Sequence, residues 1–381
     1  MLKYIQYRPL YRYLFLFRPK FYKAFYCTYL EKYFAKKAPF IDENTFLVWE
    51  PCSKSHGEVV PGYVKYLSDL GYKVSVLVSP TRYKEGLFSR FDDENVFYNN
   101  MSQKEIHKYF KNNTLKNAKG ILVTTVGKLS NGEDYDDAYN TFKKDNDKQK
   151  ILLVEHEIKH TFDNNTLKEE IITLRQVDYK DAKTVVINPH YFGAVNITPK
   201  NETTNFVSVG AIRAKKKNNQ LIIDSVKELR NKDITNFKVT VIGKGNLSGV
   251  PKEIKKYFDI KGRLNFADMY KEIEKADFFL TSYNKDEERH IRYITTGTSG
   301  NFQLIYGFAK PCLIIKSFAP INGLDDKNSI VYDKNSDYAE AMQKAIEMTQ
   351  DEYKIMQNNL KDYADKLYRV SLENMRRLIN E

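Results

Sequence analysis

The sequence predicts an α/β protein built from two doubly wound domains, each with a parallel sheet covered by helices. Short apolar runs alternate with stretches whose apolar residues recur at helical spacing, which is typical of parallel strands joined by crossover helices. The 381 residues exceed what one hydrophobic core usually covers, which favours two domains. The polar, proline-bearing stretch PKNETTN at 199–205 divides the alternation into two series and is the predicted linker.

The first series predicts an N-terminal domain over residues 41–198. A glycine-bearing loop, PCSKSHGE, follows the first apolar run. It leads into VVPGYVKYLSDLG, which has helical spacing and Gly71 as its stop. The expected strands are 45–50, 73–80, 121–126, 151–154 and 184–189.

The second series predicts a C-terminal domain over residues 206–360. The charged tail 337–380 has a helical pattern, and its last part, residues 361–381, is expected to pack back on the N-terminal domain as a helix. The expected strands are 206–210, 237–245, 257–262, 277–283, 312–316 and 329–333, and the expected helices are 219–231, 267–276 and a third that begins near 300.

The charge distribution favours an anionic partner, because the net charge is +12. Residues 1–40 hold nine Lys or Arg, one acidic residue and fourteen Phe or Tyr, a composition suited to the headgroup region of an anionic membrane. We expect a membrane-association segment there, with packing on the protein as the alternative and stacking on single-stranded nucleic acid ranked lower. No window approaches the ~20 apolar residues of a membrane span, and a signal-peptide core is missing. The expected location is cytoplasmic, peripheral on the inner face of the cell membrane.

Metal and cofactor chemistry is not predicted. Cys27, Cys52 and Cys312 are scattered, and no His and Cys residues have metal-ligand spacing. We expect no metal and no cofactor other than a co-substrate.

Two stretches of the C-terminal half suit a diphosphate. Arg213 and Lys217 follow the strand FVSVG and supply a planar fork and a point charge for phosphate oxygens. The stretch TTGTSGNF at 295–302 begins a helix without any acidic residue, so Gly297, Thr298, Ser299 and Gly300 are predicted to present backbone N–H groups and hydroxyls to an anion.

Four motifs follow one another in the order VGAIRAKKKNNQLIIDSVKEL, FKVTVIGKG, ADMYKEIEKADFFLTSY and GTSGNFQLIYGFAKPCLI. In this order they resemble the C-terminal domains of GT-B glycosyltransferases, above all the large GT4-like retaining family that includes bacterial glycan-assembly enzymes. The resemblance implies two Rossmann-like domains that face a central cleft. It also implies that Arg213 and Lys217 contact the donor phosphates.

The resemblance has one departure. Many members of that family carry two Glu residues across this loop and helix, where this sequence has Thr296 and Leu304. Ribose recognition, donor identity and stereochemistry are therefore open. His290 and Arg292 are the candidates for contact with the donor sugar. Gly243, Gly245 and Arg263 are the candidates for contact with the nucleotide.

In the N-terminal half, His56, Gly57 and Glu58 resemble the family's first loop, which approaches donor and acceptor. His156, after the strand ILLV, is the candidate that faces the sugar or acceptor. Glu155 or Glu157 is a candidate base if the enzyme inverts, whereas in a retaining enzyme the donor phosphate takes the proton.

The function expected from these residues is metal-independent transfer of a hexosyl group, with a retaining outcome favoured. The donor would be a nucleotide-sugar, favoured as a UDP-sugar. The acceptor would be a lipid-linked or polysaccharide acceptor in the synthesis of a bacterial surface glycan, either lipopolysaccharide or capsule. The alternatives are a sugar-nucleotide epimerase of the same fold and a non-catalytic basic module that binds nucleic acid or membrane.

Overall fold

The computed structural model describes residues 39–51, 56–103, 105–106, 117–125, 149–163, 170–210, 219–243 and 250–381. Almost all of the predicted membrane-association segment, residues 1–38, lies outside these ranges. In the described part, no helix combines the length and the apolar character that a bilayer crossing requires.

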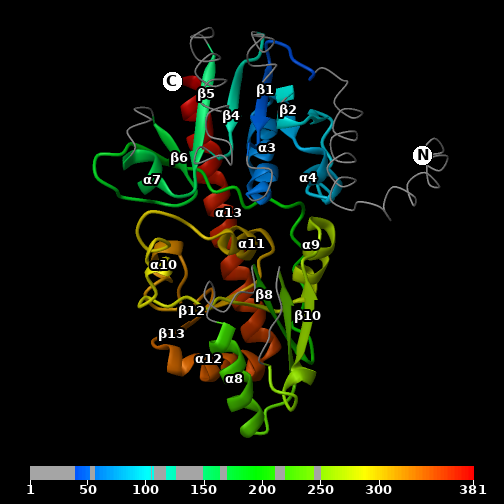
Figure 1. Cartoon of the computed structure of the whole chain (residues 1–381), viewed down its shortest axis with the longest axis vertical. Coiled ribbons are helices and arrows are strands. Elements are labelled where there is room, and N and C mark those ends of the chain that lie inside the picture. The colour runs from blue at the N-terminus through cyan, green and yellow to red at the C-terminus, as the bar shows by residue number, and fades with distance from the viewer. Residues whose placement is uncertain are drawn as a thin grey trace, which may run out of the picture.

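Two parallel sheets, one above the other, form the molecule (Figure 1). The N-terminal sheet has seven strands in the order β3-β2-β1-β4-β5-β6-β7, and the C-terminal sheet has six in the order β10-β9-β8-β11-β12-β13. Every paired register is parallel, as predicted for doubly wound sheets. The strands are β1 Thr45–Trp49, β2 Lys73–Val78, β3 Val96–Asn100, β4 Gly120–Val123, β5 Lys150–Glu155, β6 Ile171–Thr173, β7 Thr184–Val186, β8 Thr204–Val209, β9 Phe237–Ile242, β10 Phe258–Gly262, β11 Phe278–Leu280, β12 Cys312–Ile315 and β13 Ile330–Tyr332.

The helices cover the sheets, and some of them begin at a side-chain cap. The side chain of Asn265 accepts a hydrogen bond from the N–H of Asp268 (2.8 Å) at the start of α9. Thr349 and Glu352 form a reciprocal capping box at the start of α13. The α-helices are α3 Val60–Asp69, α4 Pro80–Lys84, α7 Ile158–Asp163, α8 Asn219–Asn231, α9 Phe266–Lys275, α10 Glu288–Ile291, α11 Gly300–Gly307, α12 Tyr338–Glu347 and α13 Gln350–Asn380.

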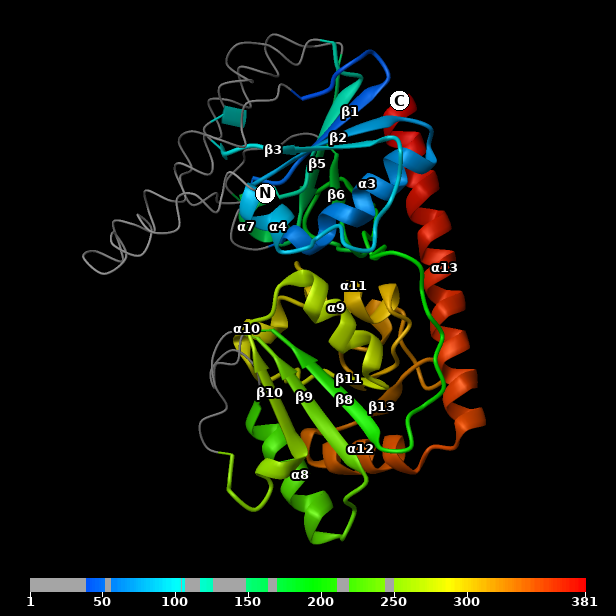
Figure 2. The same cartoon turned by 90° about the vertical axis from the view of Figure 1, so that its right-hand side faces the viewer.

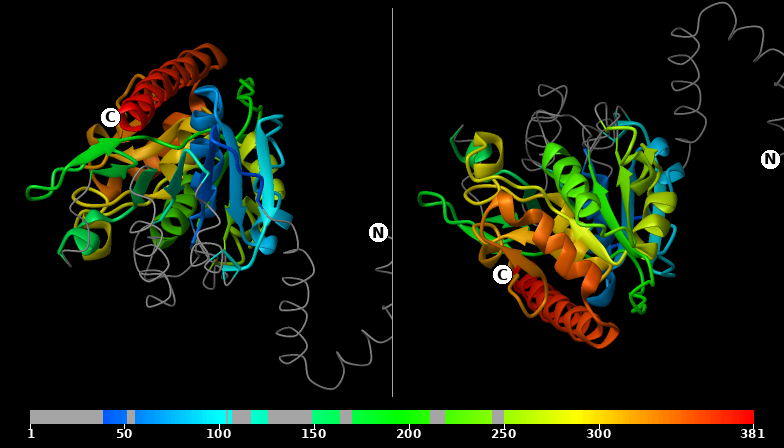
Figure 3. Two further views of the ribbon diagram at one scale, coloured as in Figure 1. Left: turned by 90° about the horizontal axis from the view of Figure 1, so that it is seen from above. Right: turned by 90° about the horizontal axis from the view of Figure 1, so that it is seen from below.

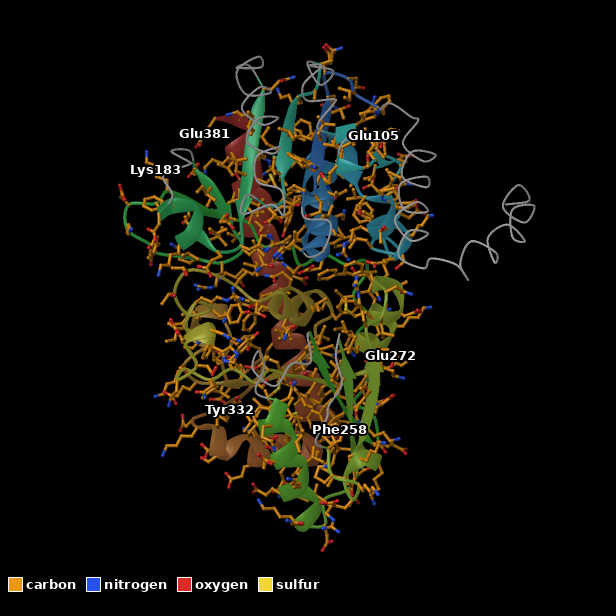
Figure 4. All side chains as sticks on the ribbon, viewed as in Figure 1. Glu105, Lys183, Phe258, Glu272, Tyr332 and Glu381 are labelled. Carbon is orange, nitrogen blue, oxygen red and sulfur yellow. The ribbon has the colours of Figure 1, made fainter. Side chains whose placement is uncertain are left out.

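Helix α13 has 31 residues and runs along both domains (Figure 2). Its first half packs in the C-terminal core through Tyr353 and Leu360, and its last turns pack in the N-terminal core through Met375 and Ile379. In both end-on views it lies on one flank of the molecule (Figure 3). Its last residue, Glu381, lies in the upper half of the view beside the N-terminal sheet (Figure 4). The helix is continuous through the domain boundary predicted at residue 360.

Two strands were not predicted. The edge strand β3, with the sequence VFYNN, is half polar and has only Val96 and Asn99 buried. Strand β6 has three residues, Ile171–Thr173, too few to give a periodic signal.

Candidate nucleotide-binding site between the domains

Three segments meet where the two sheets face each other: 56–58 after β1, 155–158 after β5, and 296–301 at the start of α11. The backbone N–H of Ile158 donates to the carbonyl of Thr296 (2.9 Å), and the N–H of Thr298 donates to the carbonyl of His156 (3.2 Å). These bonds form a short antiparallel bridge between Glu157 and Gly297. The loops that follow strands in the two domains are therefore joined directly.

The bridge brings a carboxylate to the entrance of α11. The hydroxyl of Thr296 donates to Oε1 of Glu157. A Cβ at position 297 would lie 2.7 Å from Oε2 of Glu157 and 3.1 Å from the carbonyl oxygen of His156, so a larger residue there would require the Glu157 side chain to shift. The sequence stretch 295–303 has no acidic residue, but the fold supplies one from the other domain.

The N-terminus of α11 offers three backbone donors. Ser299 is the N-cap residue with φ −105° and ψ 132°, and its side chain makes no capping bond. Within the described residues, the N–H groups of Ser299, Gly300 and Asn301 have no hydrogen-bond partner. A second carboxylate lies in front of them, because Oε1 of Glu58 is 2.9 Å from the position of a Cβ on Gly300. The helix end thus faces an anionic group of the chain itself.

Fewer of the predicted N–H groups are available to an anion than the sequence indicated. We expected the N–H groups of 297–300 to point toward a ligand. The N–H of Gly297 instead donates to the carbonyl of Arg292 (2.7 Å), and that of Thr298 belongs to the interdomain bridge. Among the described residues, the donors left for an anion are those of Ser299, Gly300 and Asn301.

His156 is held as a neutral imidazole. Its Nε2–H donates to the carbonyl of Thr124 (3.0 Å), and its ring lies 4.2 Å from the ring of His56, centroid to centroid. Burial, together with the neighbouring His56, lowers the pKa of His156 to about 3. Because the carbonyl of Thr124 can only accept, the proton of the neutral ring is on Nε2, and Nδ1 is the unprotonated nitrogen. His156 can therefore accept a hydrogen bond from a sugar hydroxyl, and it cannot donate a proton as an acid near neutral pH.

Glu155 holds its own loop in place. Its side chain is buried, and Oε1 accepts hydrogen bonds from the N–H groups of His156 (2.8 Å) and Glu157 (3.1 Å). This geometry fits a positioning residue for His156 better than a base that takes a proton from an acceptor.

Arg175 was missed by the sequence analysis and links the two domains at this site. Its guanidinium donates to the carbonyls of Gly297 (2.9 Å), Tyr293 (3.2 Å) and Gln176 (2.6 Å). The side chain is buried, and burial lowers its pKa while the charge of Glu157 opposes that shift. No sequence signal marked it, because it stands alone in LRQVDYK with no cationic neighbour beside it.

The remaining candidates are more dispersed. His290 is buried and accepts at Nδ1 from the N–H of Asn284 (3.0 Å), so it supports the segment before α11. Arg292 is exposed over the ring of Tyr293. Arg263 reaches Glu85 of the N-terminal domain (3.2 Å). The N–H of Gly243 donates to the carbonyl of Gly262 (2.8 Å), next to Arg263. Gly57 is buried after His56, and the sequence candidates Arg213, Lys217 and Gly245 lie outside the described residues.

No protein-family model and no curated protein matches the chain. Among solved structures, it matches an alpha-glucosyltransferase in complex with UDP and a 13-mer DNA containing an HMU base. The TM-score is 0.60 and the identity 12%, over 88% of this chain and 99% of that chain. The chain has the GT-B fold.

Two further structures complete the comparison. A glycosyltransferase involved in avilamycin A biosynthesis matches this GT-B chain with a TM-score of 0.51 and 12% identity, over 88% of this chain and 98% of that one. The pneumococcal O-GlcNAc transferase in complex with UDP and GlcNAc matches with a TM-score of 0.48 and 13% identity. That match covers 74% of this chain and 60% of the other chain. The chain thus resembles GT-B glycosyltransferases, as predicted.

In this GT-B chain the two positions of the missing Glu pair differ in character. Thr296 is at the interdomain bridge, where Glu157 supplies a carboxylate. Leu304 is 3% exposed and belongs to the C-terminal core. A carboxylate is therefore present beside the first position but comes from the N-terminal domain, whereas the second position has an apolar side chain that packs in the C-terminal core.

Proposed function

We propose that the chain is a glycosyltransferase that transfers a sugar from a UDP-sugar to a lipid-linked or polysaccharide acceptor, with retention of configuration and without a metal. The observation that carries the proposal is the N-terminus of α11, whose three N–H groups without a partner among the described residues lie next to the bridge between the two domains of a GT-B fold. Such a helix end, with roughly half a unit of positive charge, stabilises the diphosphate that leaves with the nucleotide.

The described residues around that helix end have different proposed roles. Gly300 and Asn301 are suited to bind a phosphate oxygen, and Nδ1 of His156 is suited to accept a hydrogen bond from a sugar hydroxyl. Arg175 and Glu157 hold the segment before α11 against the N-terminal domain. Arg213 and Lys217 are predicted from sequence alone to add cationic charge at the phosphates.

The retaining outcome is supported by the hydrogen bonds of Glu155 and Glu157, because both carboxylates already have partners within the protein. Oε1 of Glu155 accepts two backbone N–H groups, and Glu157 is bonded to Thr296. A leaving phosphate that takes the proton from the acceptor needs neither of these carboxylates as a base.

The acceptor, the membrane and the pathway rest on composition. The net charge of +12 and the cation-rich, aromatic-rich segment 1–40 support an acidic lipid surface and an acceptor held there. A cytoplasmic, peripheral location in surface-glycan synthesis follows from the same argument.

The test is nucleotide binding measured by calorimetry on the full chain. We expect UDP to bind, and Arg213→Ala and Lys217→Ala each to weaken binding about tenfold or more, because each removes a charge-assisted bond to a phosphate. Lys215→Ala removes the same charge from the same stretch and is expected to change binding less than twofold. The proposal is wrong if UDP, ADP and GDP all fail to bind the folded wild-type chain.

A further inference from the structure

A cavity of about 260 Å³ lies where the two domains and α13 meet. It is lined by residues that follow β6 and β7, by residues of α11 and the turn at 320–323, and by Tyr363 and Leu367 of α13. We call it the seam cavity. His56, Glu58 and His156 do not line it, and Thr298 is its only contribution from 296–300. The seam cavity therefore adjoins the proposed nucleotide site, with which it shares Arg175 and Thr298, but most of its lining is its own.

The seam cavity contains a buried amide without partners. Gln303 of α11 is 0% exposed, and within the described residues neither its Oε1 nor its Nε2 has a hydrogen-bond partner. The hydroxyl of Thr298, which also lines the cavity, is buried and unpartnered as well. Each such group costs about 1–3 kcal/mol when left unsatisfied, so three atoms around one cavity indicate an occupant that bonds to them.

The charges around the cavity favour a neutral occupant. Among the described residues that line it, none is Asp or Glu, and Arg175 is the one that carries a formal charge. Three N–H groups of Arg175 already donate to carbonyl oxygens, and the charge of Glu157 acts on the same guanidinium. Two of its five N–H groups are not used by these bonds and can donate to a neutral oxygen.

The shape of the lining favours a small ring with hydroxyl groups. Phe302, Tyr306 and Tyr363 provide aromatic surface, and the rings of Tyr306 and Tyr363 lie 5.6 Å apart. The Nε2 donor and the Oε1 acceptor of Gln303 both lack a partner. A hydroxyl can satisfy both, because it accepts one hydrogen bond and donates another. The volume is just below the roughly 300–1,000 Å³ of sites for drug-sized ligands, which limits the occupant to about one sugar ring.

We propose that the seam cavity binds a neutral, hydroxylated ligand of the size of one monosaccharide, with Gln303 and Thr298 bonded to its hydroxyls. Because both domains and α13 line the cavity, the ligand stabilises this arrangement of the domains relative to any in which they are apart. The site does not depend on the nucleotide donor, and it is assigned from its own residues.

The experiment uses the full chain with D-glucose and N-acetyl-D-glucosamine as probes, and detects binding by saturation-transfer NMR and by thermal unfolding. We expect a saturable response to at least one sugar. Gln303→Leu removes the amide at nearly constant volume and should weaken that response at least tenfold. The variant should unfold at the same or a higher temperature than the wild type, because an unsatisfied buried amide is lost.

Gln357→Leu is the matched control. Gln357 is 1% exposed and also has an unpartnered Oε1, but it lies on α13 outside the cavity, so this variant should bind the sugar like the wild type. An equal response in wild type and Gln303→Leu would identify a non-specific solvent effect and overturn the proposal. The absence of any saturable response would mean that ordered water alone fills the cavity. Binding of inorganic phosphate in place of either sugar, lost in Gln303→Leu, would show that the proposed ligand class is wrong.

Discussion

Glu58 and Glu157 place two carboxylates around a helix end whose own sequence, 295–303, has no acidic residue. Glu58 lies in front of Gly300, and Glu157 bonds to Thr296, although the two acids belong to loops after different strands of the N-terminal sheet. A helix N-terminus attracts whichever anion is within reach. The carboxylate of Glu58, which lies beside Gly300, is such an anion.

Glu58→Gln is therefore expected to strengthen UDP binding. The neutral amide removes a charge that repels the diphosphate, and a helix-end interaction of about 0.3–1 kcal/mol corresponds to a roughly two- to fivefold lower Kd. Calorimetry on the full chain measures the change. Glu287→Gln, at an exposed position before α10, is the control and should leave the Kd unchanged. Weaker UDP binding in Glu58→Gln would instead place Glu58 in productive contact with the ligand.

At the scale of elements, α11 is positioned by contacts from outside its own domain. All its residues from Asn301 to Gly307 are buried, and the segment before it is bonded to the 155–158 loop and to Arg175. Arg90, Arg175 and Arg263 all cross between the domains, Arg90 through an ion pair with Glu274, and the last two do so in different surroundings. Arg175 is buried and bonds to three carbonyls, whereas Arg263 is largely exposed in its pair with Glu85.

Arg175→Lys is expected to lower the free energy of unfolding by about 1–3 kcal/mol, because an ammonium cannot reach three carbonyls with one planar fork and leaves buried acceptors unpaired. Arg263→Lys keeps the charge of an exposed pair, and its effect should stay within about 0.5 kcal/mol. Urea unfolding of both variants makes the comparison. Equal losses would contradict the role given to the buried Arg175.

At the scale of the whole molecule, α13 is tied to the end of the N-terminal domain around His190. Its Nε2 lies 3.0 Å from the carbonyl of Ala364 on α13, and its Nδ1 lies 3.1 Å from the carbonyl of Asn188. Burial lowers the pKa of His190 to about 4, a shift that Asp365 and the two carbonyls partly oppose. Asn188 and Asn374 add bonds between the N-terminal domain and α13.

Stability should therefore fall as the pH is lowered from about 6.5 toward 4. In that window the unfolded chain protonates His190 and the folded chain does not, so protons favour unfolding. At pH 5 the contribution of His190 is a loss of roughly 2 kcal/mol relative to pH 7. His156, whose pKa is also lowered, adds a loss of the same sign.

Urea unfolding of wild type and His190→Gln at pH 7 and pH 5 tests this. The variant is less stable at pH 7, because it loses a buried bond, but its deficit should shrink by roughly 2 kcal/mol at pH 5. A deficit that is the same at both pH values would show that His190 does not titrate differently in the two states.

The sequence by itself determined the architecture, because strand and helix periodicity is local. The run TFLVW forms β1, and NQLIIDSVKELRN forms α8. The alternation of strands and helices also predicted that the strands of both sheets are parallel. The sequence also located the helix start at Gly300. Only the tertiary structure decided which groups meet there. Glu58, Glu157 and Arg175 are distant from α11 in sequence, and no local pattern specifies a contact between loops of two domains. The partners of the helix end are set by how the two sheets face each other, and that depends on packing across the seam and along α13.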